Sequence, residues 1–293
     1  MTHPSPAHGA SRLTLIGPAL LGAVSFSCAD VLTKVTLWEG DVLTIVTLRG
    51  LIGIAIMFLW LQFTRPRKKP ISPRARWISF GLGALFAANV FLVFKAIEAV
   101  DVPIAILTYF VYPLLTGMAA AAAGLEPFTW RGALAAVAAF LGLALMIGAH
   151  PAGVALFGIV AALGGACCRV LLLLLTRATM QGVDAVAITW HSLISSTALL
   201  GGAALLSSTW QPPVTGAGWI AVIALSISVM TGILGVYAST TRIGPFRTAL
   251  FMNLEPLLTT IGSAVFLNEV ITPLQGVGGA VMIVALTLFQ LRR

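Results

Sequence analysis

The chain has 293 residues, of which 59% are hydrophobic and only 9% are charged, and its net charge is +8. Soluble domains carry about 25% charged residues, so this composition excludes an ordinary soluble protein and predicts that lipid surrounds most of the chain. The excess positive charge lies in short connections between apolar runs, which is typical of membrane orientation and argues against nucleic-acid binding.

Apolar runs recur along the chain, and each has about the 20 residues that a helix needs to cross a bilayer. We predict an all-α membrane protein with ten transmembrane helices at 13–36, 41–63, 77–97, 103–124, 129–149, 152–175, 184–207, 218–240, 245–267 and 272–291. Pro103 and Pro245 stand at span starts, where a missing N–H costs little. Most connections are short, so successive helices are expected to be antiparallel neighbours.

The basic residues predict the orientation of these spans. If the N-terminus lies inside, 13 of the 17 Lys and Arg residues fall in inside segments, and the other four lie within spans. The 13 are Arg12, Arg65, Arg67, Lys68, Lys69, Arg74, Arg76, Arg131, Arg177, Arg242, Arg247, Arg292 and Arg293. We therefore expect a multi-pass protein of the cell inner membrane with both termini in the cytoplasm.

Two short phrases in the chain are nearly identical. One is YPLLT at 112–116 and the other is EPLLT at 255–259. The alignment that superposes these phrases also places Glu126 on Glu269. This match predicts that the chain contains two copies of one structural unit.

The predicted spans divide into five per copy, which gives repeats at 1–149 and 150–293. Because five is odd, the second copy must enter the membrane from the opposite side. Inverted repeats of this kind are typical of transporters that open a central site alternately to the two sides of the membrane. Alternating access is therefore the leading interpretation of the repeat.

Three stretches carry a resemblance to a known family: TLRG at 47–50, KAIEAVDVPIAILTYFVYPLLT at 95–116 and VYASTTRIGPFRTALFMNLEPLLTTIGSAVFLNE at 236–269. The chain resembles, over its whole length, the EamA-type ten-span proteins of the drug/metabolite transporter superfamily. The resemblance implies that spans 1, 3, 4, 6, 8 and 9 surround a central cavity and that spans 5 and 10 lie outside it. Within that family the chain is most similar to amino acid exporters of the YddG type, which move aromatic amino acids.

Polar residues deep in the spans are the candidates for function, because a charge at bilayer depth costs about 3 kcal/mol and usually faces a cavity or a partner. The deep polar residues are Asp30, Arg49, Asn89, Arg169, His191, Asn253 and Glu255. Lys34 and Lys95 lie nearer the outer span ends, from which a long side chain reaches the surface. Lys95 is also a candidate contact for a substrate carboxylate, since it lies on a cavity span.

A slightly different alignment of the halves, which superposes Cys28 on Cys167, places Asp30 on Arg169, and these two residues have opposite charges. We expect them to form an ion pair, either as fixed packing or as a gate that opens and closes, and direct contact with substrate is a third possibility. Arg49 matches the second-span Arg of the family, and we expect it to pair with a carboxyl group or with helix-end carbonyls. For His191 the alternatives are a packing role and a proton relay.

Glu255 stands next to Pro256 near the middle of the ninth span, and Pro113 has the matching place in the fourth. Each proline removes a helical hydrogen bond, so we expect helix kinks that face a wet cavity. Glu255 beside such a kink is a candidate site for an ammonium group, another cation or a proton. The alternative is a structural carboxylate held by a nearby base.

Tyr109, Tyr112 and Tyr237 fall on spans that the family places around the cavity, and their rings and hydroxyls suit aromatic or cationic ligands. With Asn89 and Asn253 they complete the candidate cavity lining, although core packing is the alternative for the tyrosines. Phe110 and Phe251 are more typical of lipid-facing or core positions.

The predicted function is export of amino acids or similar metabolites by alternating access around a central cavity. The alternative is a proton-coupled drug or cation antiporter, and remoter alternatives are a channel or an intramembrane enzyme. The chain contains no P-loop motif, and its three cysteines lack metal-ligand spacing with His, so we expect no cofactor, no metal and no catalytic residue. Its expected partners are a small-molecule substrate and the lipid bilayer. We expect a monomer, and the sequence leaves a larger assembly open.

Overall fold

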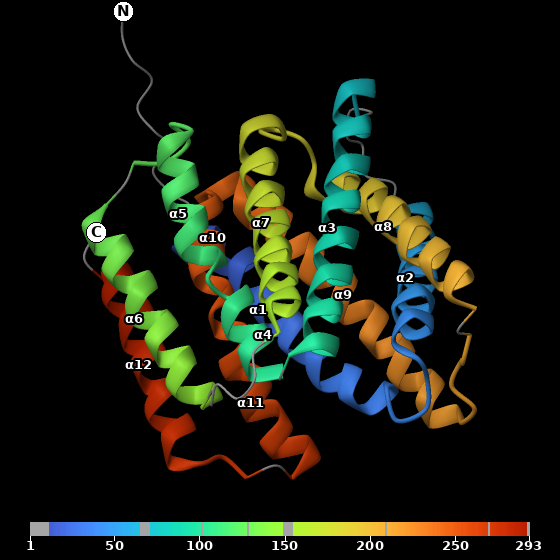
Figure 1. The fold of residues 1–293 in the computed structure, drawn as a ribbon. Coiled ribbons are helices and arrows are strands. Elements are labelled where there is room, and N and C mark those ends of the chain that lie inside the picture. The colour runs from blue at the N-terminus through green and yellow to red at the C-terminus, as the bar shows by residue number, and fades with distance from the viewer. Residues whose placement is uncertain are drawn as a thin grey trace, which may run out of the picture.

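The computed structural model describes residues 12–64, 71–100, 102–127, 129–148, 155–208, 210–268 and 270–291. In these residues the chain forms twelve α-helices and no β-strand (Figure 1). The helices are α1 (Arg12–Thr36), α2 (Val42–Thr64), α3 (Pro73–Ala99), α4 (Val102–Tyr109), α5 (Tyr112–Ala122), α6 (Trp130–Ile147), α7 (Leu156–Thr179), α8 (Ala185–Ser207), α9 (Gly216–Ile243), α10 (Pro245–Met252), α11 (Leu254–Leu267) and α12 (Pro273–Leu291). The predicted all-α fold is therefore confirmed for these parts of the chain.

These helices correspond in order to the ten predicted spans, because the fourth span is divided into α4 and α5 and the ninth into α10 and α11. In the described residues, seven segments are long and apolar enough to cross a membrane: α1, α2, α3, α4 with α5, α7, α9, and α10 with α11. Helices α6 and α12 are shorter apolar helices. The chain is thus a multi-pass membrane protein, and the total of ten spans stays a prediction.

The two divided spans are interrupted where proline kinks are expected. Helix α4 ends at Tyr109, and α5 carries Pro113 in its first turn. Helix α10 ends at Met252, and α11 carries Pro256 in its first turn. Proline lacks an N–H and its ring collides with the carbonyl four residues earlier, so each proline favours a kink or a break at its position.

Helix packing repeats between the two halves of the molecule. Helix α1 packs along α9, and in the same way its counterpart α7 packs along α3. Helix α2 packs on its own counterpart α8, and α6 packs on α12. Figure 1 shows α6 and α12 side by side at the edge of the bundle, running in opposite directions. Antiparallel counterparts are what an inverted repeat requires.

Close contact between α6 and α12 depends on two glycines. A Cβ added at Gly142 would lie 2.7 Å from the carbonyl oxygen of Gly278, and a Cβ added at Gly278 would collide with the carbonyl oxygen of Gly142. Small residues let helix backbones approach closely, which is the common way of packing helices in lipid, where apolar side chains gain little from leaving their solvent. The pair therefore holds the outer edge of the bundle together.

The predicted orientation of the termini rests partly on residues that the structure does not describe. The following lie outside the described residues: Arg65, Arg67, Lys68, Lys69, Arg292 and Arg293. The orientation therefore stays a prediction. We call the end of the bundle at which α1 begins the basic end, and the end at which α1 finishes the open end.

Candidate functional site: a central cavity

The helices surround a cavity of about 610 Å³ that reaches from the middle of the bundle to the open end. This volume is within the range of small-molecule pockets, about 300–1,000 Å³. Residues at the helix ends mark its mouth: Lys34, Ile97, Val102, Ile271 and Gln275. A metabolite-sized molecule therefore has room inside.

Most of the wall comes from α1, α3, α4 and α11, and α7 contributes Arg169; all five helices belong to spans that the family resemblance places around a cavity. Span 8 contributes Val229 on α9. The structure differs from the expectation at three residues, because Arg49 on α2, Met146 on α6 and Gln275 on α12 also line the cavity. Spans 5 and 10 pack mainly on each other, yet one residue of each reaches the cavity.

The structure places the predicted site residues in two groups. The first group lines the cavity and consists of Asp30, Arg49, Asn89, Tyr109, Arg169, Glu255 and Pro256. The second group lies elsewhere and consists of Lys95, Tyr112, Pro113, His191, Tyr237 and Asn253.

Asp30 is held by groups from α2 and α11. Its Oδ2 accepts a hydrogen bond from the hydroxyl of Thr259 at 3.0 Å, and that hydroxyl is also 2.9 Å from the carbonyl oxygen of Glu255. Arg49 and Lys34 are the cations whose charges act on Asp30. The negative charge of Asp30 is therefore balanced within this cluster.

No salt bridge joins Asp30 to Arg169 in the described part of the chain, so the expected ion pair is not present. Arg169 lies between aromatic rings, with its guanidinium carbon 5.6 Å from the ring centre of Phe26 and 5.8 Å from that of Tyr112. Both contacts are at cation–π distance. Symmetry-related positions thus hold opposite charges in different surroundings: cations act on Asp30, whereas Arg169 lies against aromatic rings.

Glu255 lies in the first turn of α11 and lines the cavity. The interruption before α11 creates a helix N-terminus in the middle of the bundle, and the positive end of the helix dipole favours a carboxylate there. The charges of Arg169 and Asp30 both act on Glu255, although neither is in contact with it. The acid therefore faces the cavity rather than being used in a salt bridge.

Asn89 and Tyr109 line the cavity beside these charges. Asn89 donates a hydrogen bond from Nδ2 to the carbonyl oxygen of Gly165 at 2.8 Å, which ties α3 to α7. The ring centre of Tyr109 is 5.3 Å from that of Tyr112 and 5.4 Å from that of Phe110. Phe110 also lines the cavity, so it is not the lipid-facing residue that was one of its expected roles.

Four of the second group are buried or half-buried away from the cavity. The Tyr237 hydroxyl forms a 2.6 Å hydrogen bond with Ser192, and Asn253 is buried with its Nδ2 unpaired among the described residues. Tyr112 is only 1% exposed and packs against Arg169. His191 Nδ1 donates to the Ala187 carbonyl within its own helix at 2.8 Å.

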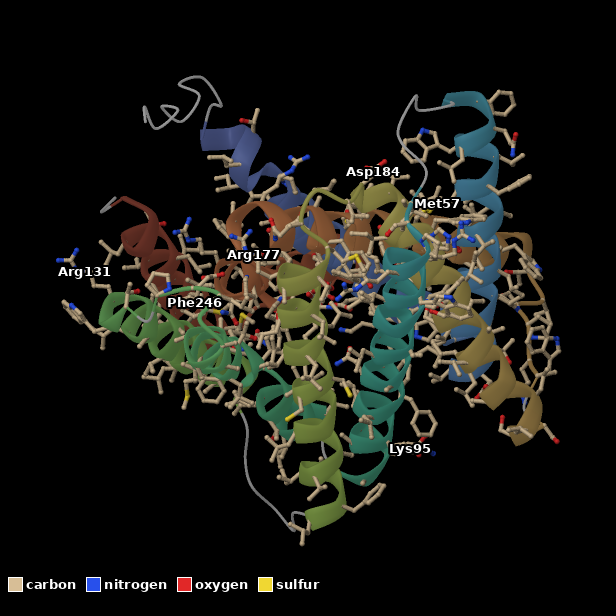
Figure 2. All side chains as sticks on the ribbon, turned by 90° about the horizontal axis from the view of Figure 1, so that it is seen from above. Met57, Lys95, Arg131, Arg177, Asp184 and Phe246 are labelled. Carbon is tan, nitrogen blue, oxygen red and sulfur yellow. The ribbon has the colours of Figure 1, made fainter. Side chains whose placement is uncertain are left out.

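The two lysines exchange their expected places. Lys95 forms a 2.7 Å salt bridge with Glu98, and Figure 2 shows it at the end of α3, directed away from the bundle. Lys34, expected at the surface, lines the cavity and lies 3.5 Å from the Ser263 hydroxyl. The reason is helix geometry, since Lys34 is one turn beyond Asp30 on the same face of α1.

Sequence reasoning missed a polar stripe on α11. Thr259 and Ser263 follow Glu255 at intervals of four residues, and all three line the cavity. Residues four apart lie on one face of a helix, so this spacing was available from the sequence. The apolar part of the wall, by contrast, had no signal in a chain so rich in apolar residues: it includes Phe26, Phe86, Phe94 and Phe110.

The basic end is closed by contacts between helix ends. The Phe246 N–H, in the first turn of α10, donates to Glu126 Oε1 at 3.2 Å, which ties α10 to the loop after α5. Arg177 donates from Nη1 to the Thr241 carbonyl at 2.6 Å, joining α7 to α9. These contacts join helices at the basic end, whereas the residues that mark the mouth of the cavity lie at the open end.

A slot formed by two glycines receives the ring of Phe246. A Cβ at Gly117 on α5 would lie 2.8 Å from this ring, and a Cβ at Gly132 on α6 would lie 2.7 Å from it. Larger residues at either position would displace the ring. We call Glu126, Phe246 and these two glycines the latch.

The comparisons with known proteins agree with this architecture. Residues 14–148 and 156–291 each match the model of the EamA-like transporter family. No curated protein matches the chain. Twenty-nine chains of solved structures match, and one of them, titled only "Crystal structure of protein", has a TM-score of 0.81 and 18% sequence identity, covering 97% of this chain and 100% of its own. That likeness shows the shared fold. The two family matches together span nearly all of the sequence, and the chain belongs to the EamA-like transporter family, with two copies of its domain.

Proposed function

We propose that the protein exports amino acids or related small zwitterions across the inner membrane by alternating access. The observation that carries the proposal is the cavity, whose wall combines both signs of charge with aromatic rings. Arg169 and Glu255 provide the charges, and Phe26, Phe86 and Phe110 provide apolar surface. A zwitterion with an apolar side chain has the complementary set of groups.

Alternating access is supported by the difference between the two ends of the bundle. The cavity reaches the open end, whereas the latch closes the basic end. With the termini in the cytoplasm, the cavity of this state opens to the outside. The repeated packing of the two halves provides the second arrangement, in which their roles are exchanged.

The proposal is tested with purified protein in liposomes. Vesicles preloaded with unlabelled amino acids should accumulate labelled phenylalanine, because a carrier exchanges substrate across the membrane. Empty liposomes are the control. A flux that neither saturates nor is stimulated by internal substrate would instead indicate a channel, and the absence of protein-dependent flux for every amino acid tried would overturn the proposal.

Glu255→Gln removes the charge from the cavity wall and keeps the size of the side chain. If this acid binds the substrate ammonium, exchange of phenylalanine should fall by about tenfold or more, since charged hydrogen bonds contribute about 1.5–3 kcal/mol. Glu98→Gln is the matched control, because Glu98 pairs with Lys95 outside the cavity. Unchanged exchange by Glu255→Gln would contradict this role.

A second candidate function is proton-coupled antiport of an organic cation. It is favoured by the presence of two carboxylates in one cavity, since Asp30 lines the wall near Glu255 and its charge acts on it. Protons should then compete with labelled tetraphenylphosphonium for the protein, and a pH gradient should drive its uptake. Uptake of amino acids without uptake of this cation would exclude the alternative.

A further inference from the structure

Arg169 is a buried cation without an anionic partner. Only 5% of its surface is exposed, it lines the cavity from the middle of α7, and no salt bridge involves it among the described residues. Its Nε is buried and has no hydrogen-bond partner there. A buried charge without a counter-charge is unfavourable, so such a group in a functional protein indicates a ligand that completes it.

Aromatic residues hold the guanidinium in place without neutralising it. The rings of Phe26 and Tyr112 lie 5.6 and 5.8 Å from the guanidinium carbon. Cation–π contacts of this kind stabilise the positive charge, and a phenol hydroxyl such as that of Tyr112 is a neutral group, so neither residue supplies a negative charge. The planar donor fork of Arg169 is therefore positioned and left without an anion.

The two cavity acids do not serve as that anion. Asp30 accepts from Thr259 and is balanced by Arg49 and Lys34. Glu255 acts on Arg169 only through space, and no salt bridge joins them in the part of the chain that the structure describes. The position beside the guanidinium is thus available to a group brought in by the substrate.

We infer that Arg169 binds the carboxylate of the substrate and makes a carboxylate a requirement for recognition. A guanidinium fork matches a planar carboxylate with two parallel hydrogen bonds, which a point charge such as Lys does not provide. Glu255 lines the same cavity and takes the ammonium, while the phenylalanine rings of the wall take an apolar side chain. The inference rests on the proposed function and narrows its substrates to carboxylates.

The test uses the purified protein and four probes of one shape: phenylalanine, phenylalaninamide, phenethylamine and 3-phenylpropionate. A ligand that binds the folded protein raises its melting temperature, so binding is measured separately from transport. The two carboxylates should raise the melting temperature of the wild-type protein. Phenylalaninamide and phenethylamine should bind about tenfold to a hundredfold more weakly than phenylalanine, because they lack the carboxylate that accepts from Arg169.

The variants separate recognition from a structural role of Arg169. Arg169→Gln should bind phenylalanine no more tightly than phenylalaninamide and phenethylamine, which keep the ammonium, and should bind 3-phenylpropionate most weakly. Arg169→Lys should retain only part of the wild-type preference for phenylalanine. A purely structural role would weaken all four ligands and preserve their order. Lys95→Gln, which removes a positive charge outside the cavity, should keep the wild-type preference. If Arg169→Gln does not fold, the four probes with the wild-type protein and with Arg169→Lys still show whether recognition requires the carboxylate.

Two results would overturn the inference: wild-type protein that binds phenethylamine as tightly as phenylalanine, or Arg169→Gln protein that keeps its preference for carboxylates. A melting temperature that neither carboxylate raises would also overturn it. Carboxylate-dependent binding without any exchange in liposomes would reject the export function alone and leave the role of Arg169 standing.

Discussion

Asn89 connects the wall of the cavity to the backbone that carries Arg169. Its Nδ2 donates to the carbonyl oxygen of Gly165, one turn before Arg169 on α7, and the side chain is only 5% exposed. A hydrogen bond between two helices fixes their distance and rotation. Asn89 therefore acts on the cavity both as a lining group and as a support for α7.

Replacing Asn89 by Ala should lower the free energy of unfolding by about 1 kcal/mol, the typical contribution of a hydrogen bond between helices in a membrane protein. The measurement is unfolding by SDS in mixed micelles, followed by tryptophan fluorescence. Gln181→Ala is the matched control, because its Nε2 bonds an exposed carbonyl of its own turn, that of Arg177, and its loss should change stability by less than about 0.5 kcal/mol. Equal stability of the two variants would show that the bond to Gly165 does not join the helices.

At the scale of the element, α10 shows how a helix that begins at the basic end of the bundle is capped. Its N-cap is Gly244, which has no side chain to accept from the first turn, and Pro245 has no N–H to offer. The acceptor comes instead from Glu126, a residue of the other repeat. The hydrogen bond that caps α10 is thus also a contact between the two halves, and its loss would leave the start of α10 without this acceptor.

Gly244→Ala should destabilise the protein by about 2 kcal/mol, which melting in detergent measures. The residue has φ of 97°, a conformation that L-residues adopt only at a cost of about 1–2 kcal/mol, and an added Cβ would overlap the Glu126 carboxylate. Gly216→Ala, in the first turn of α9, meets nothing within 4 Å and should leave the melting temperature unchanged or slightly raised. A Gly244→Ala protein as stable as Gly216→Ala would contradict the role of this glycine beside the latch.

At the scale of the whole molecule, the repeat accounts for predicted site residues that miss the cavity. In the alignment that superposes Pro113 on Pro256, Tyr237 corresponds to Phe94 and Asn253 to Phe110, and both phenylalanines line the cavity. If the two halves exchange conformations, Tyr237 and Asn253 line the cavity that opens at the basic end. They are therefore expected to serve in the opposite state.

Cysteine labelling tests this exchange. In a background without the three native cysteines, Val93→Cys lies on the cavity wall and should react with an impermeant maleimide from the outside. Its counterpart Val236 is 2% exposed, and Val236→Cys should react only from the cytoplasmic side, when the other state forms. Ala139→Cys, buried on α6, is the control that should react from neither side. Reaction of Val236→Cys from the outside, or from neither side of actively exchanging protein, would contradict the exchange.

The element order and the two interruptions were predictable because they depend on local properties. Apolar length predicts helices, and Pro113 and Pro256 each remove a helical hydrogen bond, which favours a kink or a break there. The position of Lys95 was also within reach of the sequence. Asn89 is itself a predicted cavity residue, and position 95, six residues later, lies about a third of a turn away on another face of the helix.

The pairing of charges was beyond the sequence because it depends on which helices meet. Asp30 and Arg169 have opposite signs and matching places, yet Thr259 and Arg49 come closer to the acid. The residue pattern of α1 does not show that α2 and α11 pack close to Asp30, and the pattern of α7 does not show which helices surround Arg169. Partners of a buried charge are set by tertiary packing, so the sequence identified the charged residues without identifying their contacts.

The latch has an unequal counterpart at the open end, and this bears on how the carrier saturates. In the same alignment of the halves, Gly117 and Gly132 correspond to Thr260 and Gln275, so the smooth slot for a ring has no equivalent there. If the protein works by the alternating access that we propose, the two closures differ in free energy and the empty carrier rests mostly in one state. Such a bias cannot move substrate against its gradient. It makes the half-saturating substrate concentration differ between the two faces of the membrane. The maximal rates in the two directions then differ in the same proportion, because net flux must still vanish when the substrate concentrations on the two sides are equal.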